Sequence, residues 1–223
     1  MPLVRDRAAW LEQLVAGASE VAHLGCADAP YTQQLLAAGL LLHERLCRVA
    51  RVTGFDVDPA ALELLGRELP GERFVLADIA AALPDQERGR YDLVVAGEVL
   101  EHVPNLDTFL QGCRGLLAPG GRLCVTVPNA CCPKIGLRAL RGRESVHPDH
   151  RVYFGPRTLT RTLASAGFLT ESLASCFAPL ASRAGRLLVN PLLALDHRLF
   201  GGPVGDGLIA VASARPNAPA IAS

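Results

Sequence analysis

Three acidic residues of this 223-residue chain stand at or just after the end of an apolar run of strand length: Asp56, Asp78 and Glu98. In an open parallel sheet, ligands bind beyond the carboxyl ends of the strands, so these residues are candidates for a binding site. A carboxylate after the second strand offers acceptor oxygens that match two neighbouring ribose hydroxyls, and Asp56 fits that role. Asp78 could accept a hydrogen bond from an exocyclic amino group while the apolar Ile79 packs on a purine ring.

The segment VAHLGCADAP (21–30) has the form of a strand that runs into a tight turn, and Gly25 is its single glycine. A dinucleotide site requires G-x-G-x-x-G so that the backbone can approach a pyrophosphate. Here Ala27, Ala29 and Pro30 follow where the later glycines would stand. Small residues still allow an uncharged or cationic group to approach. The loop therefore favours a thioether or sulfonium nucleoside over a dinucleotide.

Histidine is the side chain whose ordinary pKa suits a general base for a hydroxyl acceptor at neutral pH. Of the six histidines, we single out His102, just beyond the fourth apolar run, and His147 and His150, in the segment after the fifth. The alternative for His102 is a histidine at the start of a helix, bonded to the backbone. His43 and His197 lie within helical patterns and are expected to be partly exposed.

The segment after the fifth apolar run also carries a local group of arginines: Arg138, Arg141, Arg143 and Arg151. They form either a solvated helix face or a clamp for an anionic acceptor, because guanidinium groups match the oxygens of carboxylates and phosphates. Both interpretations remain open.

Charge is balanced over the whole chain, with 22 Lys+Arg and 22 Asp+Glu, so no net field attracts nucleic acid or an anionic membrane. The seven cysteines form no C-x-x-C pair and fall mostly in apolar runs, which predicts buried thiols in a reducing compartment and no metal site. No segment approaches the ~20 apolar residues that span a bilayer, and the first residues carry charges where a signal peptide is apolar. We therefore expect a cytoplasmic protein with a small-molecule partner, without nucleic acid or membrane partners, and we leave a homodimer open.

Short apolar runs alternate with helical patterns up to residue 128. The predicted strands are 20–24, 51–56, 73–78, 91–97 and 121–128; the predicted helices are 4–16, about 30–50 with a break at Gly39, 59–68 and 105–117. This alternation is typical of βαβ units in a parallel sheet covered by helices on both faces.

The pattern changes after Asn129. An irregular segment runs to 155, a helix is predicted over 156–166, and two last strands at 168–177 and 205–214 flank a helical stretch at 182–199. Because no linker composition interrupts the chain, we expect one domain over 1–214, followed by a disordered tail at 215–223.

Four motifs in order resemble the class I S-adenosylmethionine-dependent methyltransferases. They are VAHLGCADAPYT, VTGFDVDPAAL, FVLADIAAALP and YDLVVAGEVLEHVPNLDTFLQGCRGLLAPGGRLCVTVPN, the last being similar to the ubiquinone-biosynthesis-like small-molecule branch. The resemblance covers roughly residues 18–178. It implies a Rossmann-like, seven-stranded, mostly parallel sheet in the order 3-2-1-4-5-7-6 with strand 7 antiparallel. A helix within 1–17 would precede this sheet, and an insert at 129–155 would form part of the acceptor pocket.

The resemblance also implies a bound S-adenosyl-L-methionine, with S-adenosyl-L-homocysteine as the product. Carried onto this sequence, it places Gly25, Cys26 and Ala27 under the methionine part, Asp56 on the ribose, Val57, Asp78 and Ile79 at the adenine, and Glu98 facing the cofactor. His23 stands where many members have an acidic residue, and Asp28 could supply that charge instead.

These features predict a methyltransferase for a small molecule. Oxygen is the preferred acceptor atom, on a sugar, nucleotide-sugar or secondary metabolite, since no N-P-P-Y signature of N-methylation follows the fourth strand. Two alternatives remain. One is a catalytically silent, methyltransferase-like binding partner, and the other is an NAD(P)-dependent oxidoreductase, which the missing glycines disfavour.

Overall fold

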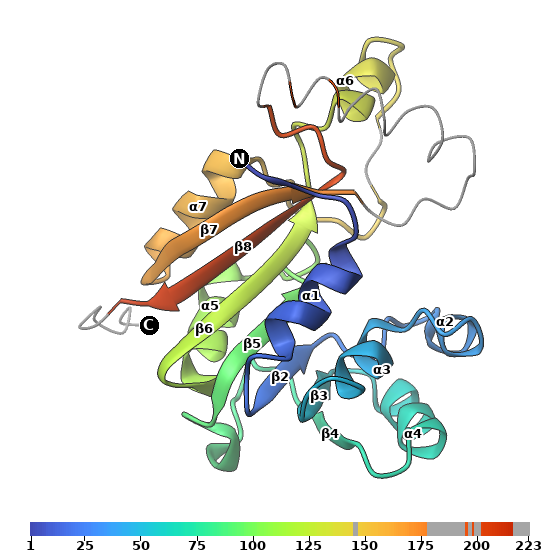
Figure 1. Cartoon of the computed structure of the whole chain (residues 1–223), viewed down its shortest axis with the longest axis vertical. Coiled ribbons are helices and arrows are strands. Elements are labelled where there is room, and N and C mark those ends of the chain that lie inside the picture. The colour runs from blue at the N-terminus through green and yellow to red at the C-terminus, as the bar shows by residue number, and fades with distance from the viewer. Residues whose placement is uncertain (145–146, 178–194, 196–197, 199–201, 216–223) are drawn as a thin grey trace.

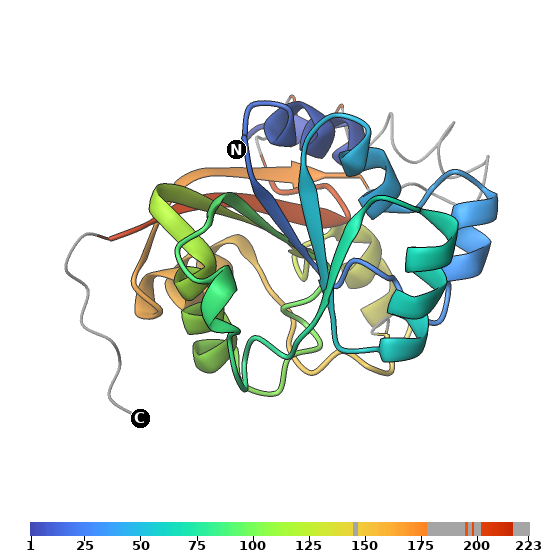
Figure 2. The ribbon, with the colours of Figure 1, turned by 90° about the horizontal axis from the view of Figure 1, so that it is seen from below.

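The computed structural model describes residues 1–144, 147–177, 195, 198 and 202–215, which form a sheet with helices on both faces (Figures 1 and 2). The strands are β1 (Leu3–Val4), β2 (Val21–Leu24), β3 (Val52–Asp56), β4 (Arg73–Leu76), β5 (Tyr91–Gly97), β6 (Leu117–Pro128), β7 (Phe168–Cys176) and β8 (Gly207–Ala214). The helices are α1 (Arg7–Val15), α2 (Thr32–Ala37), α3 (Leu42–Cys47), α4 (Pro59–Glu68), the 3-10 helix η1 (Asp85–Glu87), α5 (Leu106–Leu116), α6 (Pro133–Ala139) and α7 (Pro156–Ser165).

The strands of the described chain pair in the order β1-β7-β8-β6-β5-β2-β3-β4. β8 runs antiparallel to both of its neighbours, β6 and β7, and the other pairs are parallel. Counted from β2, this is the order 3-2-1-4-5-7-6 with strand 7 antiparallel, so the fold expected from the sequence is confirmed. The short β1 adds an edge strand beside β7, and it contains Val4, which we expected in a helix.

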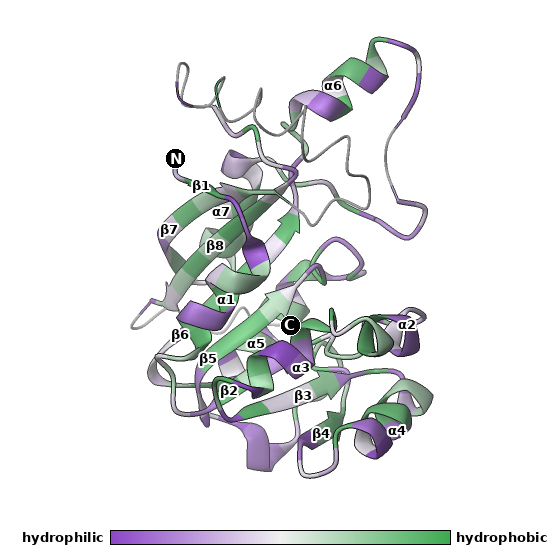
Figure 3. Cartoon of the chain, turned by 45° about the vertical axis from the view of Figure 1, so that its right-hand side comes forward, coloured by the Kyte–Doolittle hydropathy of each residue, from purple (hydrophilic) through white to green (hydrophobic). Residues whose placement is uncertain are grey.

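The strands of the sheet are largely hydrophobic (Figure 3), and their apolar side chains pack against helices on both faces. Leu11 of α1 and Leu46 of α3 pack with Val95 on one face, whereas Leu110 of α5 packs with Val94 on the other. Val94 and Val95 are neighbours in β5, and both have 0% exposure, because successive side chains of a strand point to opposite faces. The continuous apolar run of β5 therefore reflects burial on both faces.

Polar caps begin the helices that follow the strands near the candidate site. Asp58 accepts hydrogen bonds of 2.9 and 3.1 Å from two amides in the first turn of α4, and Pro59 occupies the first helical position. Asn105 caps α5 in the same way, at 3.1 and 3.2 Å. Gly39, with a φ of +65°, separates α2 from α3, as the sequence predicted.

Two other local expectations were wrong. β6 begins at Leu117 rather than at residue 121, because Leu117 already pairs with Tyr91 before a register shift in the β5–β6 ladder. The segment expected to be irregular contains α6, which Pro133 opens within its first turn.

The predicted helix at 182–199, apart from residues 195 and 198, and the tail beyond 215 lie outside the described residues. Among the helices described, none combines the length and apolar character needed to cross a lipid bilayer.

Candidate functional site

The carboxyl ends of β2, β3, β4 and β5 surround a small pocket of about 100 Å³. It is lined by Leu24, Gly25, Phe55, Asp56, Val57, Ala77, Asp78, Ile79, Val99 and Phe109. An apolar wall with a few placed polar groups is the usual form of a small-molecule site, and here two carboxylates supply the charge. A pocket of this size suits part of a nucleoside, so the rest of a ligand would extend along the edge of the sheet.

Gly25 turns the chain sharply at the end of β2. Its φ is +68°, and a Cβ built there would lie 2.7 Å from Cγ2 of Val99. Its amide donates a hydrogen bond of 2.9 Å to the Phe55 carbonyl in the neighbouring strand. This position therefore requires glycine both for its backbone conformation and for the space beside it.

Asp56 is fixed by the backbone on both sides of the pocket. Its Oδ2 accepts a hydrogen bond of 3.0 Å from the Ala27 amide, and its Oδ1 accepts bonds of 2.8 and 3.1 Å from the amides of Val57 and Asp58. Because a carboxylate has about four acceptor positions, one remains for a hydroxyl group without loss of these bonds. Asp56 thus ties the loop after β2 to the loop after β3 and stays able to bind a ligand.

The other end of the same pocket combines the apolar Val57 and Ile79 with the carboxylate of Asp78. Asp78 is exposed, and its Oδ1 accepts a hydrogen bond of 3.0 Å from the Ala80 amide. Ile79 is buried, whereas Val57 is 66% exposed, which is high for a branched apolar side chain. The structure therefore brings together the four residues predicted to hold a ribose and an adenine, including Asp56.

The rest of the first loop divides into buried and exposed residues. Cys26 and Ala27 have 0% exposure, and burial raises the pKa of the Cys26 thiol. Their amides donate hydrogen bonds to the Phe55 carbonyl and to Asp56. Asp28 follows with a φ of +52° and is exposed, so its carboxylate is accessible to a charged group.

His23 does not line the pocket. It is 1% exposed, its ring stacks on His43 with centroids 5.4 Å apart, and the two Nδ1 atoms are 3.2 Å apart. His43 is fully buried, so the expectation that it is partly exposed was wrong: α3 packs this residue against the sheet beside Phe74. His23 therefore does not take the place of the acidic residue that many methyltransferases carry at this position.

Glu98 follows β5 with a φ of +55°, an unusual conformation for a residue with a Cβ. Its Oε1 lies 2.6 Å from Nη1 of Arg7 and accepts a hydrogen bond of 3.2 Å from the Thr126 hydroxyl. The helix α1 thus supplies a cation to the end of the sheet. Sequence reasoning missed Arg7 because nothing in its local pattern distinguishes it from other surface arginines.

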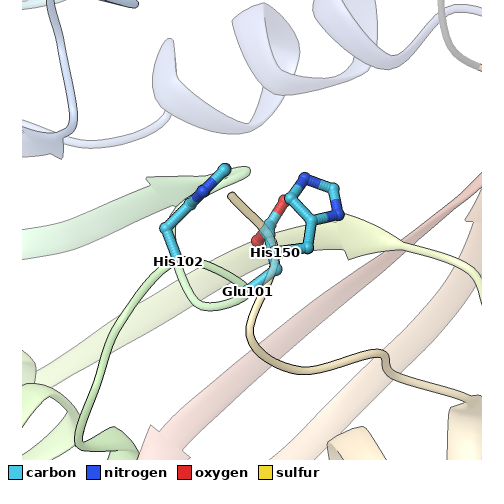
Figure 4. A group of neighbouring side chains, drawn as sticks. All are labelled: Glu101, His102 and His150. Atoms are coloured by element: carbon cyan, nitrogen blue, oxygen red, sulfur yellow. The ribbon is translucent and has the colours of Figure 1, made fainter. Parts of the chain in front are cut away.

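A second cluster lies beside this edge, where Glu101, His102 and His150 meet (Figure 4). One ligand-capable atom from each residue lies within 4.8 Å of the other two. Glu101 is 0% exposed, and both of its carboxylate oxygens lack a hydrogen-bond partner among the described residues. Glu101 was not singled out in the sequence, although its position directly before His102 was a usable signal.

Two hydrogen bonds hold this cluster together across 47 residues or more of sequence. Nδ1 of His102 is 3.2 Å from the Asp149 carbonyl, and the Arg151 amide donates to the Glu101 carbonyl at 2.7 Å. His147 lies close by, with its ring centroid 5.2 Å from that of His150. The three histidines proposed as bases are therefore neighbours.

Burial changes the protonation behaviour of this cluster. It raises the pKa of the Glu101 carboxyl to about 8, and the negative charge of Glu98 adds to the effect. Burial, followed by the charges of His102 and His147, lowers the pKa of His150. Near neutral pH, Glu101 is thus largely protonated and lies beside a neutral His150 imidazole.

The chain leaves the sheet after β6 and returns to it before α7. Asn129 forms an isolated parallel bridge with Phe154, and the Ala130 amide donates to the Phe154 carbonyl at 2.8 Å. Between these points lie α6 and the stretch that carries His147 and His150. The local arginines are exposed: Arg138, Arg141, Arg143 and Arg151.

A wider cavity of about 460 Å³ lies between residues 103–107, the pair Arg151–Val152, and α7. None of the predicted cofactor residues lines it. We place the candidate site in the smaller pocket because strand ends, anchored carboxylates and the strained loops meet there.

Comparison with known proteins agrees with this geometry. The methyltransferase domain family matches residues 22–123. A ubiquinone biosynthesis O-methyltransferase from Aeromonas salmonicida is 31% identical over 160 residues, which cover 65% of this chain and 65% of that protein. A trans-aconitate 2-methyltransferase from Methylobacterium radiotolerans is 33% identical over 139 residues, covering 62% of this chain and 44% of that protein. The chain thus spans less than two thirds of either relative.

A solved structure extends the likeness over almost the whole chain. The N-methyltransferase NodS from Bradyrhizobium japonicum, in complex with S-adenosyl-L-homocysteine, has a TM-score of 0.56 at 18% identity and covers 94% of this chain and 86% of its own. The chain is thus similar to S-adenosylmethionine-dependent methyltransferases, in sequence over residues 22–123 and in fold over almost its whole length.

Proposed function

We propose that this chain transfers a methyl group from S-adenosyl-L-methionine to an oxygen atom of a small-molecule acceptor. The observation that carries the proposal is the anchored carboxylate of Asp56 beside the tight turn at Gly25. Both relatives described above are named for small-molecule chemistry, one as an O-methyltransferase of ubiquinone biosynthesis and one for trans-aconitate. A sugar, nucleotide-sugar or secondary metabolite remains our proposed acceptor class.

The pocket fits the nucleoside part of this cofactor. Asp56 would accept from the ribose, and Val57 and Ile79 would enclose the adenine with Asp78 at its polar edge. Because Gly25 has no Cβ, its backbone can lie against Val99 at this edge of the pocket, where the methionine part would bind. When bound, the cofactor supplies a methyl group on a positively charged sulfur.

This chain's own residues have to position the acceptor and receive its proton. Methyl transfer depends mainly on alignment at near-attack distance and on exclusion of water. Val99 lines the pocket, and Glu101 and His102 stand two and three residues after it, so the cluster adjoins the pocket through one short loop. We propose that the acceptor lies between them, under the 129–155 segment, with His102, His147 or His150 taking its proton.

Calorimetric titration of the full chain with S-adenosyl-L-homocysteine tests the cofactor assignment. Asp56→Ala should weaken binding at least tenfold, because it removes the ligand oxygens and the tie between two loops. Glu63→Gln on the exposed face of α4 is the matched control and should leave affinity unchanged. Incubation with S-adenosyl-L-methionine and sugars, nucleotide-sugars, phenols and carboxylic acids, followed by mass spectrometry, then identifies the acceptor.

The outcomes separate the alternatives. Binding of the cofactor product without methylation in any acceptor class would indicate a silent binding partner. Saturable binding of NAD(P) together with no affinity for S-adenosyl-L-homocysteine would indicate an oxidoreductase and would overturn the proposal.

A further inference from the structure

We propose that Glu101, His102 and His150 bind one divalent transition-metal ion of the zinc type, and that this ion holds the acceptor oxygen. The acceptor role rests on the function proposed above, whereas the binding of the ion does not. The sequence predicted no metal site because its cysteines form no C-x-x-C pair, and the three ligands come from two segments far apart in the chain.

The ligand set is that of a catalytic metal site. It offers one carboxylate oxygen and two imidazole nitrogens, each within 4.8 Å of the others. Around a tetrahedral Zn²⁺ with bonds of about 2.1 Å, ligand atoms stand roughly 3.4 Å apart, so shifts of about 1 Å would close the site. Three protein ligands leave a further position open, as in sites that bind a substrate or water.

The buried carboxylate points to a missing cation. Glu101 has 0% exposure, and neither of its oxygens has a hydrogen-bond partner in the part of the chain that the structure describes. A buried carboxyl group without a hydrogen-bond partner is costly, and coordination of a metal ion would satisfy its oxygens. Arg7 is engaged with Glu98 at 2.6 Å. Nδ1 of His150 is likewise buried and unpartnered, so two of the three residues present unsatisfied atoms at one place.

The Asp149 carbonyl orients the third ligand, His102. Because Nδ1 of His102 lies 3.2 Å from the Asp149 carbonyl, that nitrogen carries the proton and Nε2 keeps its lone pair. Metal-binding histidines usually donate their second nitrogen to a carbonyl or carboxylate in this way. The 2.7 Å hydrogen bond from the Arg151 amide to the Glu101 carbonyl fixes the two ligand-bearing segments beside each other.

The site gives the acceptor a defined place. An ion at this point could take a hydroxyl or phenol oxygen in its open position and stabilise the deprotonated form. His102 and His150 would then be ligands, so of the three histidines proposed as bases only His147 would be free to take the proton and pass it to solvent. The oxygen would then lie beside the loop that contributes residue 99 to the cofactor pocket. The proposed substrate class is therefore an acceptor with a hydroxyl group, and a second oxygen on the same acceptor would allow chelation.

The test is a metal titration without cofactor or acceptor. The full chain carries Cys131→Ser, because this thiol is exposed and would bind zinc by itself. After removal of metal with EDTA, Zn²⁺ is titrated in competition with a chromogenic chelator, and Co²⁺ is added separately to report coordination geometry by its absorption spectrum. We expect one equivalent of Zn²⁺, a Co²⁺ spectrum of nitrogen and oxygen ligands, and weaker Mg²⁺ binding.

Variants locate the ion. Glu101→Gln and His150→Ala should each weaken Zn²⁺ binding by 10- to 100-fold. Asp149→Asn is the control: its side chain is 76% exposed and pairs with His147, while its carbonyl is unchanged, so binding should stay within about twofold. Circular dichroism verifies that each variant is folded.

Three results would overturn the metal site: folded parent protein that binds no stoichiometric Zn²⁺, equal affinity in the ligand variants, or tighter binding of Mg²⁺ than of Zn²⁺. Zinc binding in a chain that has no affinity for S-adenosyl-L-homocysteine would support the site and remove the methyl-transfer function instead.

Discussion

Nη1 of Arg7 lies 2.6 Å from Oε1 of Glu98, so an ion pair joins the first turn of α1 to the loop that follows β5. The Arg7 side chain is 20% exposed and that of Glu98 is 35% exposed, so the contact is partly shielded from water. It holds Glu98 in its left-handed conformation at the edge of the pocket. The N-terminal helix is therefore part of the candidate site as well as of the core.

Arg7→Gln should lower the free energy of unfolding by about 1 kcal/mol, since partly exposed ion pairs contribute little more than that. It should also weaken binding of S-adenosyl-L-homocysteine severalfold, because Glu98 would lose its partner beside the pocket. Urea denaturation and calorimetry measure the two effects. Arg45→Gln is the control: it breaks the 2.6 Å pair with Glu12 between α1 and α3, away from the pocket, and should change stability alone.

Gly25→Ala should reduce stability by about 1–3 kcal/mol and abolish cofactor binding. The left-handed backbone at this position is strained for a residue with a Cβ, and the new Cβ would lie only 2.7 Å from Cγ2 of Val99. The matched control is Gly39→Ala, where φ is +65° but no atom lies within 4 Å of the new Cβ. It should cost about 1 kcal/mol and leave the affinity unchanged. Equal losses of affinity in both variants would mean that strain, and not the space at Gly25, matters.

The buried pair His23 and His43 predicts a loss of stability in acid. Burial lowers the pKa of His43 from 6.5 to about 4, and burial together with the charge of His43 lowers the pKa of His23 well below its usual range. Below pH 6.5 the unfolded chain binds protons that the folded chain does not. The free energy of unfolding should therefore fall as pH decreases from 6.5 toward 4, by up to roughly 1.4 kcal/mol per unit for each histidine.

His43→Gln isolates this effect from the carboxylates that titrate in the same range. It keeps a polar group of similar reach near Cys47, whose Sγ lies 3.4 Å from Nε2 of His43. Urea unfolding at several pH values should give a shallower decline in this variant than in the parent protein. Parallel curves for the two proteins would contradict a neutral His43 in the folded state.

Glu101→Gln should stabilise the metal-free chain by about 1–3 kcal/mol, because it replaces a buried, unpartnered carboxyl group with an uncharged one of the same shape. The variant should at the same time lose methyl transfer. Thermal unfolding in EDTA measures the gain in stability, and an assay of methyl transfer measures the loss of activity. A less stable variant would show that Glu101 is already satisfied in the folded protein.

The sheet could be predicted from the sequence because its strands are buried runs at wide spacing. The bounds of α4, residues 59–68, were predicted correctly, since Asp58 and Pro59 mark its start. By contrast, β1 is 2 residues long and forms only beside β7, so tertiary pairing creates it. The burial of His43 also depends on where α3 packs, and helical periodicity did not reveal that.

The pocket was more predictable than the cluster next to it. Gly25, Asp56 and Asp78 lie at the end of a strand or within two residues of it, and parallel strands end at one edge, so their meeting follows from topology. His102 and His150 meet because the backbone carbonyls of Glu101 and Asp149 accept hydrogen bonds from the facing segment, for which no spacing rule exists. Sequence could name these histidines as candidates, but it could not place a buried carboxyl group between them.

The bridge between Asn129 and Phe154 closes the intervening segment on itself at the rim of the sheet. Chain that departs and returns at one point can lengthen, shorten or change composition without shifting a strand. Related proteins could therefore differ in the acceptors that they bind through changes in this segment alone, while the strand ends that form the cofactor pocket stay the same.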